Sequence, residues 1–104
     1  MSDARLLFVL HHRRGPAVPE GTEVVDHPQI AEHYAFLGRR ADDGTLVAAG
    51  PMAGSSGEGM TVLSVPTIED AERLATVDDE SVVARVLDVT VTPWRVVMGP
   101  GLAV

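Results

Sequence analysis

Apolar residues along the chain occur either in short runs or at a spacing of three to four residues, and these two patterns predict four strands and two helices. The first run, Leu6–Leu10, is apolar at every position, which is typical of a strand buried on both faces of a sheet. Two further strands are predicted at Thr45–Ala49 and Met60–Val65, and a longer one at Val86–Val97. Because Pro93 lies near the end of the last run, we expect that strand at an edge of the sheet or at a bulge.

The two predicted helices begin at polar residues whose side chains can accept hydrogen bonds from free backbone amides. Asp26 is the expected N-cap of the first helix, whose apolar residues recur at helical spacing until the stop at Gly44. Thr67 is the expected N-cap of the second helix, with an aspartate three residues later in place of the glutamate of a capping box. The acidic run 78–80 interrupts this helix, and a short helical turn is expected to follow it.

The predicted order is β-α-β-β-α-β, the ferredoxin-like arrangement of an α+β fold, in which an antiparallel sheet carries both helices on one face. A length of 104 residues suits a single domain over 1–104, and residues 98–104 are expected to form a mobile tail. The other sheet face is mixed in the last strand, where it carries the only tryptophan, Trp94, and apolar in the first. We therefore expect two copies to pack their sheets together as a homodimer.

Composition narrows the partners that the chain can bind. The formal net charge of −7 disfavours binding to nucleic acid or to an anionic membrane. With no cysteine, the chain has neither disulfides nor thiolate chemistry and suits a reducing compartment. It shows neither a signal-peptide pattern nor an apolar run of the roughly 20 residues that span a bilayer, so a cytoplasmic location is expected.

The stretch from His33 to Pro51 carries the clearest chemical signal. It places one histidine on an otherwise apolar helix face, breaks at Gly44, and continues as a strand that ends in Gly50-Pro51. Imidazole exchanges protons near neutral pH, so a histidine in this setting can serve as the base of a small pocket. The alternative is a histidine that is hydrogen-bonded at the edge of the core.

Taken together, these segments resemble the YciI-like (YCII-related) family of small dimeric α/β-barrel proteins, over about residues 5–98. The resemblance rests on the stretch from His33 to Pro51, the strand from Met60, the helix around 69–74 and the ending 91–95. It implies a homodimer with a pocket in each subunit for a small-molecule ligand.

The resemblance also implies that a histidine and an aspartate face this pocket. The histidine corresponds to His33. Counting from Ala71, or back from Pro93, places the aspartate at Asp78, and a shift by one residue would place it at Asp79. The proline that usually follows the family aspartate is missing here.

Some members of the family resemble enzymes that eliminate or isomerise small unsaturated acids. We therefore expect an acid/base enzyme of the lyase or isomerase type, without a cofactor, acting on a small carbonyl or carboxylate compound. His33 would carry the proton, and Asp78 would orient the imidazole ring of His33. The alternatives are a non-catalytic protein that binds a small ligand and a structural dimer.

Five further residues are candidates for substrate binding. A guanidinium binds carboxylates in bidentate fashion, which suggests Arg14, although a solvated strand end is the plainer interpretation. Aromatic and thioether side chains near the pocket can serve as lining or as core. The candidate set is Gly50, Pro51, Met60, Trp94 and Arg14.

The remaining histidines suggest little by themselves. His11 and His12 are adjacent on a strand and point to opposite faces, so one of them can approach His33, although a polar strand end is favoured. A metal site from one of these two with His27 and His33 is conceivable, but no pair has the i, i+4 spacing of a helical site. We therefore expect no metal.

The glycine-rich segment 54–59 lacks the Gly-Lys-Ser/Thr element of a phosphate-binding loop and is expected to be a hairpin that covers the pocket.

Overall fold

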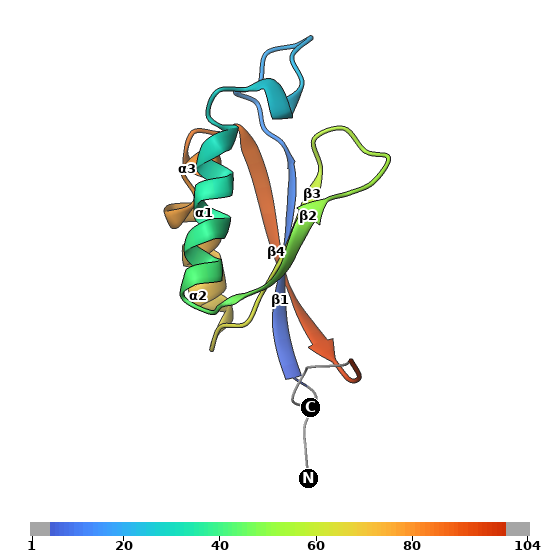
Figure 1. Cartoon of the computed structure of the whole chain (residues 1–104), viewed down its shortest axis with the longest axis vertical. Coiled ribbons are helices and arrows are strands. Elements are labelled where there is room, and N and C mark those ends of the chain that lie inside the picture. The colour runs from blue at the N-terminus through green and yellow to red at the C-terminus, as the bar shows by residue number, and fades with distance from the viewer. Residues whose placement is uncertain (1–4, 100–104) are drawn as a thin grey trace.

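The computed structural model describes residues 5–99 and has a four-stranded antiparallel sheet with helices against one face, so the α+β class is confirmed (Figure 1). The chain is elongated, with extents of 52 × 27 × 20 Å. The elements in order are β1 (Arg5–Arg14), a 3-10 turn η1 (Val24–Asp26), α1 (Ile30–Asp42), β2 (Leu46–Pro51), β3 (Gly59–Leu63), α2 (Ile68–Arg73), a π-helical turn η2 (Leu74–Asp78), α3 (Glu80–Val83) and β4 (Leu87–Val96).

The strands lie in the order β2-β3-β1-β4, with β1 in the middle of the sheet. Phe8 of β1 is opposite Leu63 of β3 on one side and Pro93 of β4 on the other. Since β4 is the last strand of this sheet, the edge position expected for Pro93 is confirmed.

Burial along β1 is extensive on the helical face, whereas on the other face Leu7 is buried and Val9 half-buried, so the predicted burial of both faces is only partly realised. On the helical face, Leu10 packs in a cluster with Phe36 of α1 and Leu63 of β3, and all three are fully buried. On the opposite face, Leu7 forms a second cluster with Val62 and Val96. The main core therefore fixes α1 over the centre of the sheet.

The first helix begins later than the sequence predicts. Asp26 is not its N-cap but ends the 3-10 turn η1, and α1 starts at Ile30 without a side-chain cap. The reason is Pro28, because a residue that precedes proline is kept out of the helical region. His27 accordingly has the extended angles φ −72° and ψ 134°.

The predicted N-cap of the second helix is confirmed, since the Thr67 hydroxyl accepts a hydrogen bond from the amide of Asp70 at 3.1 Å. The expected interruption is also present. The π-helical turn η2 follows α2, the backbone becomes extended at Asp79, and Asp79 then caps the short helix α3. The strand boundaries differ from the predicted ones by one to four residues at each end.

Met98 and Gly99 follow β4 without regular structure, and the rest of the predicted tail, 100–104, lies outside the described residues.

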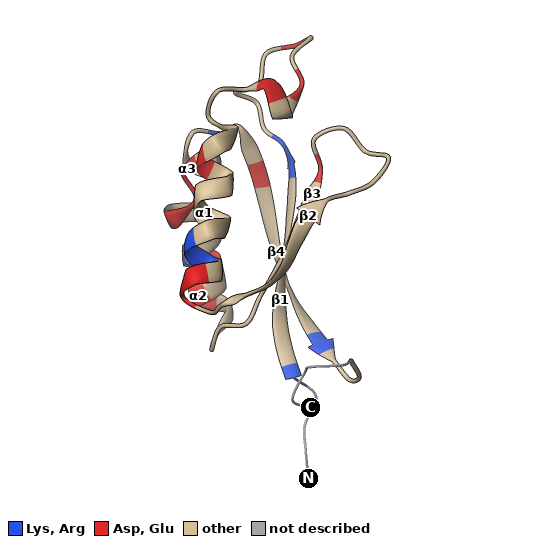
Figure 2. Ribbon diagram, viewed as in Figure 1, with Lys and Arg blue, Asp and Glu red and all other residues tan. Residues whose placement is uncertain are grey.

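Acidic residues gather on the helices and the upper loops, whereas most of the sheet is uncharged (Figure 2). None of the helices within residues 5–99 is long and apolar enough to cross a membrane.

Candidate functional site

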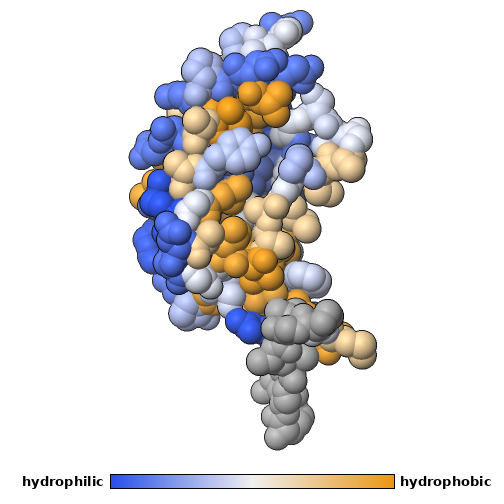
Figure 3. All heavy atoms as spheres, viewed as in Figure 1, coloured by the Kyte–Doolittle hydropathy of each residue, from blue (hydrophilic) through white to orange (hydrophobic). Residues whose placement is uncertain are grey.

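A cavity of about 150 Å³ opens beside the start of α1, the C-terminal part of β1 and the β2–β3 hairpin. In the view of Figure 3, apolar side chains come to the surface between the helices and this hairpin. The lining is mostly apolar side chains and glycine backbone, with two imidazoles and a few polar groups. It comprises His12, Val24, Val25, Ile30, His33, Tyr34, Leu37, Gly50, Pro51, Ser55, Gly57, Glu58, Gly59, Met60 and Leu87.

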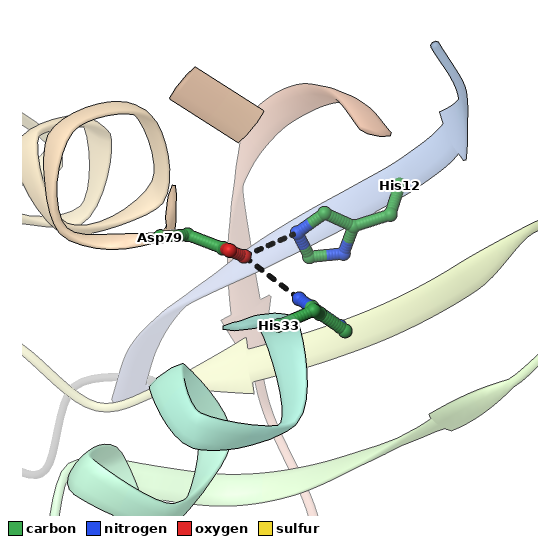
Figure 4. A group of neighbouring side chains, drawn as sticks. All are labelled: His12, His33 and Asp79. Atoms are coloured by element: carbon green, nitrogen blue, oxygen red, sulfur yellow. Dashed lines mark hydrogen bonds and ion pairs between the residues drawn. The ribbon is translucent and has the colours of Figure 1, made fainter. Parts of the chain in front are cut away.

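His33 of α1 is hydrogen-bonded to a fully buried carboxylate behind the cavity wall. Its Nδ1 lies 2.7 Å from Oδ2 of Asp79 (Figure 4). Because a carboxylate only accepts, Nδ1 carries the proton, and Nε2 of a neutral ring is then free to accept one. The His33 side chain is 13% exposed and that of Asp79 is 0% exposed, so only the histidine reaches the cavity.

The second oxygen of Asp79 is held in place by Ser81. Oδ1 accepts hydrogen bonds from the Ser81 amide at 3.0 Å and from its hydroxyl at 2.6 Å. Burial by itself raises the pKa of Asp79, but the hydrogen bonds from His33 and Ser81 outweigh it, and the net effect is a lowered pKa. The carboxylate is therefore ionised at neutral pH and fixed in orientation, as a partner for a proton-carrying imidazole must be.

The choice of Asp78 as the partner of His33 is corrected by this geometry. Oδ2 of Asp78 lies 2.6 Å from Nη1 of Arg40 and 3.4 Å from Nη2 of Arg39, and its side chain is 39% exposed. The physical reason is the change in backbone conformation between the two residues: Asp78 ends the π-helical turn, whereas Asp79 is extended and caps α3, so the adjacent side chains have different partners.

A second histidine, which sequence reasoning did not select, lies against this pair. His12 of β1 is 1% exposed, its ring centroid is 4.5 Å from that of His33, and its Nε2 is 4.0 Å from Oδ2 of Asp79 (Figure 4). Neither of its ring nitrogens has a hydrogen-bond partner within the described part of the chain. The available signal was strand alternation, which places His12 on the same face as Phe8 and Leu10.

The pKa of His12 is lowered from 6.5 to about 4, mainly by burial and also by the nearby His33, with the Asp79 carboxylate opposing the shift. His12 is therefore neutral at neutral pH. The two imidazoles at the cavity consequently differ, because one is paired with a carboxylate and the other is buried without a partner.

Three of the five expected substrate-binding residues, Gly50, Pro51 and Met60, line the cavity. Trp94 is opposite Leu7 in the β1–β4 register and is not among the lining residues. Arg14 donates hydrogen bonds to the carbonyls of Thr22, Val18 and Pro19, so its guanidinium holds the loop after β1 and does not line the cavity.

The charged group at the cavity is acidic. Glu58 of the hairpin lines it, with Oε1 2.8 Å from Nε2 of His11, and none of its lining residues is lysine or arginine. The arrangement can thus transfer a proton through His33, but the lining residues provide no lysine or arginine to hold an anionic ligand.

Comparison with family models and with curated proteins finds no match to the chain.

Proposed function

We propose that the chain is a YciI-like protein that acts as an acid/base enzyme of the lyase or isomerase type on a small carbonyl compound. The observation that carries this proposal is the 2.7 Å hydrogen bond between Nδ1 of His33 and Oδ2 of Asp79 at the wall of an open cavity. His33 is the catalytic proton carrier. Asp79 does not reach the cavity and is the positioning residue.

The reaction begins with removal of a proton from a carbon next to the carbonyl group by Nε2 of His33. The ring becomes an imidazolium, which the carboxylate of Asp79 stabilises through the proton on Nδ1. Return of the proton to another carbon completes an isomerisation, and its transfer to a leaving group completes an elimination. General acid–base catalysis of this kind contributes about 10²–10⁴-fold in rate.

The lining favours a neutral substrate over a carboxylate. Glu58 contributes a negative charge, the lining has neither lysine nor arginine, and the side chains around His33 are mainly apolar. A cavity of this volume is similar to one of about 150 Å³ that accepts benzene. A ketone the size of a six-membered ring therefore fits both the volume and the charge.

We also propose that the sheet follows the ferredoxin-like arrangement and pairs with a second copy through its face opposite the helices. Support comes from Trp94, which is 47% exposed and lies opposite Leu7 in the β1–β4 register, and from the apolar cluster around Leu7 on that face. Light scattering tests the dimer: Trp94→Glu is expected to shift the molar mass from that of two chains to that of one. An unchanged mass would contradict this interface.

Hydrogen–deuterium exchange tests the proposed chemistry without knowledge of the natural substrate. Chelator-treated protein is incubated in D₂O with cyclohexanone, and loss of the protons beside the carbonyl is followed by NMR. We expect exchange above the buffer rate with the wild type, and a fall of about 10²-fold or more with His33→Gln or Asp79→Asn. Asp78→Asn is the matched control and should keep the wild-type rate.

The mostly apolar lining also supports a second function, the binding of a small ligand without chemistry. In that case cyclohexanone would bind, its protons would exchange only at the buffer rate, and its affinity would survive Asp79→Asn. Exchange that is catalysed equally by wild type and His33→Gln would contradict the proton-carrier role.

A further inference from the structure

We propose that His12, His33 and Asp79 bind a divalent transition-metal ion of the zinc class, and that this ion competes with the hydrogen bond between His33 and Asp79. One potential ligand atom from each residue lies within 4.8 Å of the other two. This inference goes beyond the proposed function and does not depend on it.

The state of His12 is the first observation that indicates a missing partner. Its side chain is more than nine-tenths buried, and neither ring nitrogen has a hydrogen-bond partner among residues 5–99. Buried polar atoms are normally satisfied, so each exception requires an explanation. Nε2 of His12 points toward Oδ2 of Asp79 across a gap of 4.0 Å, which is too long for a hydrogen bond (Figure 4). A bridging ion accounts for that separation.

The ligand types determine which ions fit. Two imidazoles with one carboxylate suit Zn²⁺ and the neighbouring first-row ions, whereas Mg²⁺ and Ca²⁺ prefer sites made of oxygen. Metal binding also requires neutral imidazole and ionised carboxylate, which are the states of His12 and Asp79 described above.

The two ligand-atom separations that involve Asp79 lie on either side of the value in a filled site. Ligand atoms at about 2.0–2.1 Å from a tetrahedral ion lie about 3.3 Å apart. The atoms of His33 and Asp79, now 2.7 Å apart, would open slightly, and those of His12 and Asp79, now 4.0 Å apart, would close slightly. Each change is smaller than about 1 Å.

The surroundings complete the site. Ser81 holds Oδ1 of Asp79 through two hydrogen bonds and leaves Oδ2 to face the two histidines, as outer groups orient ligands in metal centres. His12 and His33 line the cavity, so in this proposal a water molecule from that side is the fourth ligand.

The ion and the acid/base pair exclude each other for a chemical reason. An ion that binds Nδ1 of His33 takes the position of the proton on that nitrogen. The single proton of the neutral ring then moves to Nε2 by way of solvent, so the ring stays neutral and no net proton is released. In the metal-bound state Nε2 therefore cannot accept a proton from a substrate.

A titration with Co²⁺, monitored by visible absorption, tests the site directly. The full chain is first treated with a chelator, and Zn²⁺ is then used to displace the bound Co²⁺. We expect one equivalent per chain and the intense absorption of four-coordinate Co²⁺, which is lost on adding Zn²⁺. His12→Gln and Asp79→Asn should abolish saturable binding, and Ser81→Ala should weaken it by about 10–100-fold.

His27→Ala is the matched control and should bind Co²⁺ like the wild type, because His27 lies before α1 and outside the cluster. Absence of a saturable absorption change in the wild type would overturn the proposal. So would a signal that persists in His12→Gln, or one that is lost in His11→Ala, since the latter would place the ion at His11 and Glu58.

A second measurement avoids any variant that fails to fold. In ¹⁵N NMR spectra of the wild type, Zn²⁺ should shift the ring nitrogens of His12 and His33 and remove the proton on Nδ1 of His33. Shifts confined to His11 or His27 would contradict the site. The two proposals can fail separately, because metal binding is measured without a carbonyl compound and exchange is measured without metal.

Discussion

Lowering the pH from about 7 to about 5 is expected to destabilise the metal-free fold through His12. In the folded chain, the pKa of His12 is lowered from 6.5 to about 4, mainly by burial; His33 and His11 act in the same direction, and Asp79 opposes them. Between these two pKa values the unfolded chain binds a proton that the folded chain does not. The free energy of unfolding therefore has its full value above about pH 6.5, and it decreases as the pH is lowered to about pH 4.

The size of this effect follows from the pKa difference. One pKa unit corresponds to about 1.4 kcal/mol. The free energy of unfolding therefore falls by about 3 kcal/mol between about pH 6.5 and about pH 4 because of the lowered pKa of His12. About 2 kcal/mol of this is already lost at about pH 5. That is a large part of the roughly 5–15 kcal/mol by which small proteins are stable. The lowered pKa of Asp79 acts below its ordinary value of 3.8, outside this window.

Urea unfolding at the two pH values, with wild type and His12→Gln, measures the effect. Glutamine does not titrate, so the variant should lose about 2 kcal/mol less than the wild type between about pH 7 and about pH 5. Subtracting the loss in the variant from the loss in the wild type removes the contribution of the other titrating groups. Equal slopes of unfolding free energy against urea concentration in the two proteins show that their unfolded states are comparable. Equal losses in both proteins would refute the reasoning.

Two pairs of substitutions test the packing and the assignment of the two aspartates, all by urea unfolding at neutral pH. Gly15→Ala is expected to destabilise the fold by about 2 kcal/mol or more, because the new Cβ would lie 2.1 Å from the carbonyl oxygen of Arg85. Gly38→Ala, in the exposed interior of α1 with no atom within 4 Å of the new Cβ, should stabilise it by about 0.5–1 kcal/mol. The reverse order would contradict the packing. Asp79→Asn should cost about 1.5–3 kcal/mol, because a buried charged acceptor is lost, and the exposed Asp78→Asn less than about 1 kcal/mol. Equal costs would contradict the assignment of their partners.

Much of the secondary structure could be predicted because it depends on local patterns. The apolar run at the start of the chain predicts strand β1, and Thr67 predicts the start of α2. The start of α1 was predicted too early because the effect of Pro28 on the preceding residue outweighs the capping preference of Asp26. The local signal for this correction was present in the sequence.

The site could be predicted only in part. His33 was found because a lone polar residue on an apolar helix face is visible in the sequence. Its partner was misplaced by one residue because the sequence does not show that the backbone becomes extended at Asp79, which gives the two adjacent aspartates different partners. His12 could not be assigned because its burial beside His33 depends on how α1 packs over β1, and this is a tertiary contact.

The central claim, that His33 forms a pair with Asp79 and not with Asp78, is tested most directly by ¹⁵N NMR of the histidine rings in metal-free protein. We expect a hydrogen-bonded proton on Nδ1 of His33 in the wild type and in Asp78→Asn, and its loss or a large shift in Asp79→Asn. A signal that is unchanged in Asp79→Asn, or one that disappears in Asp78→Asn, would contradict the account.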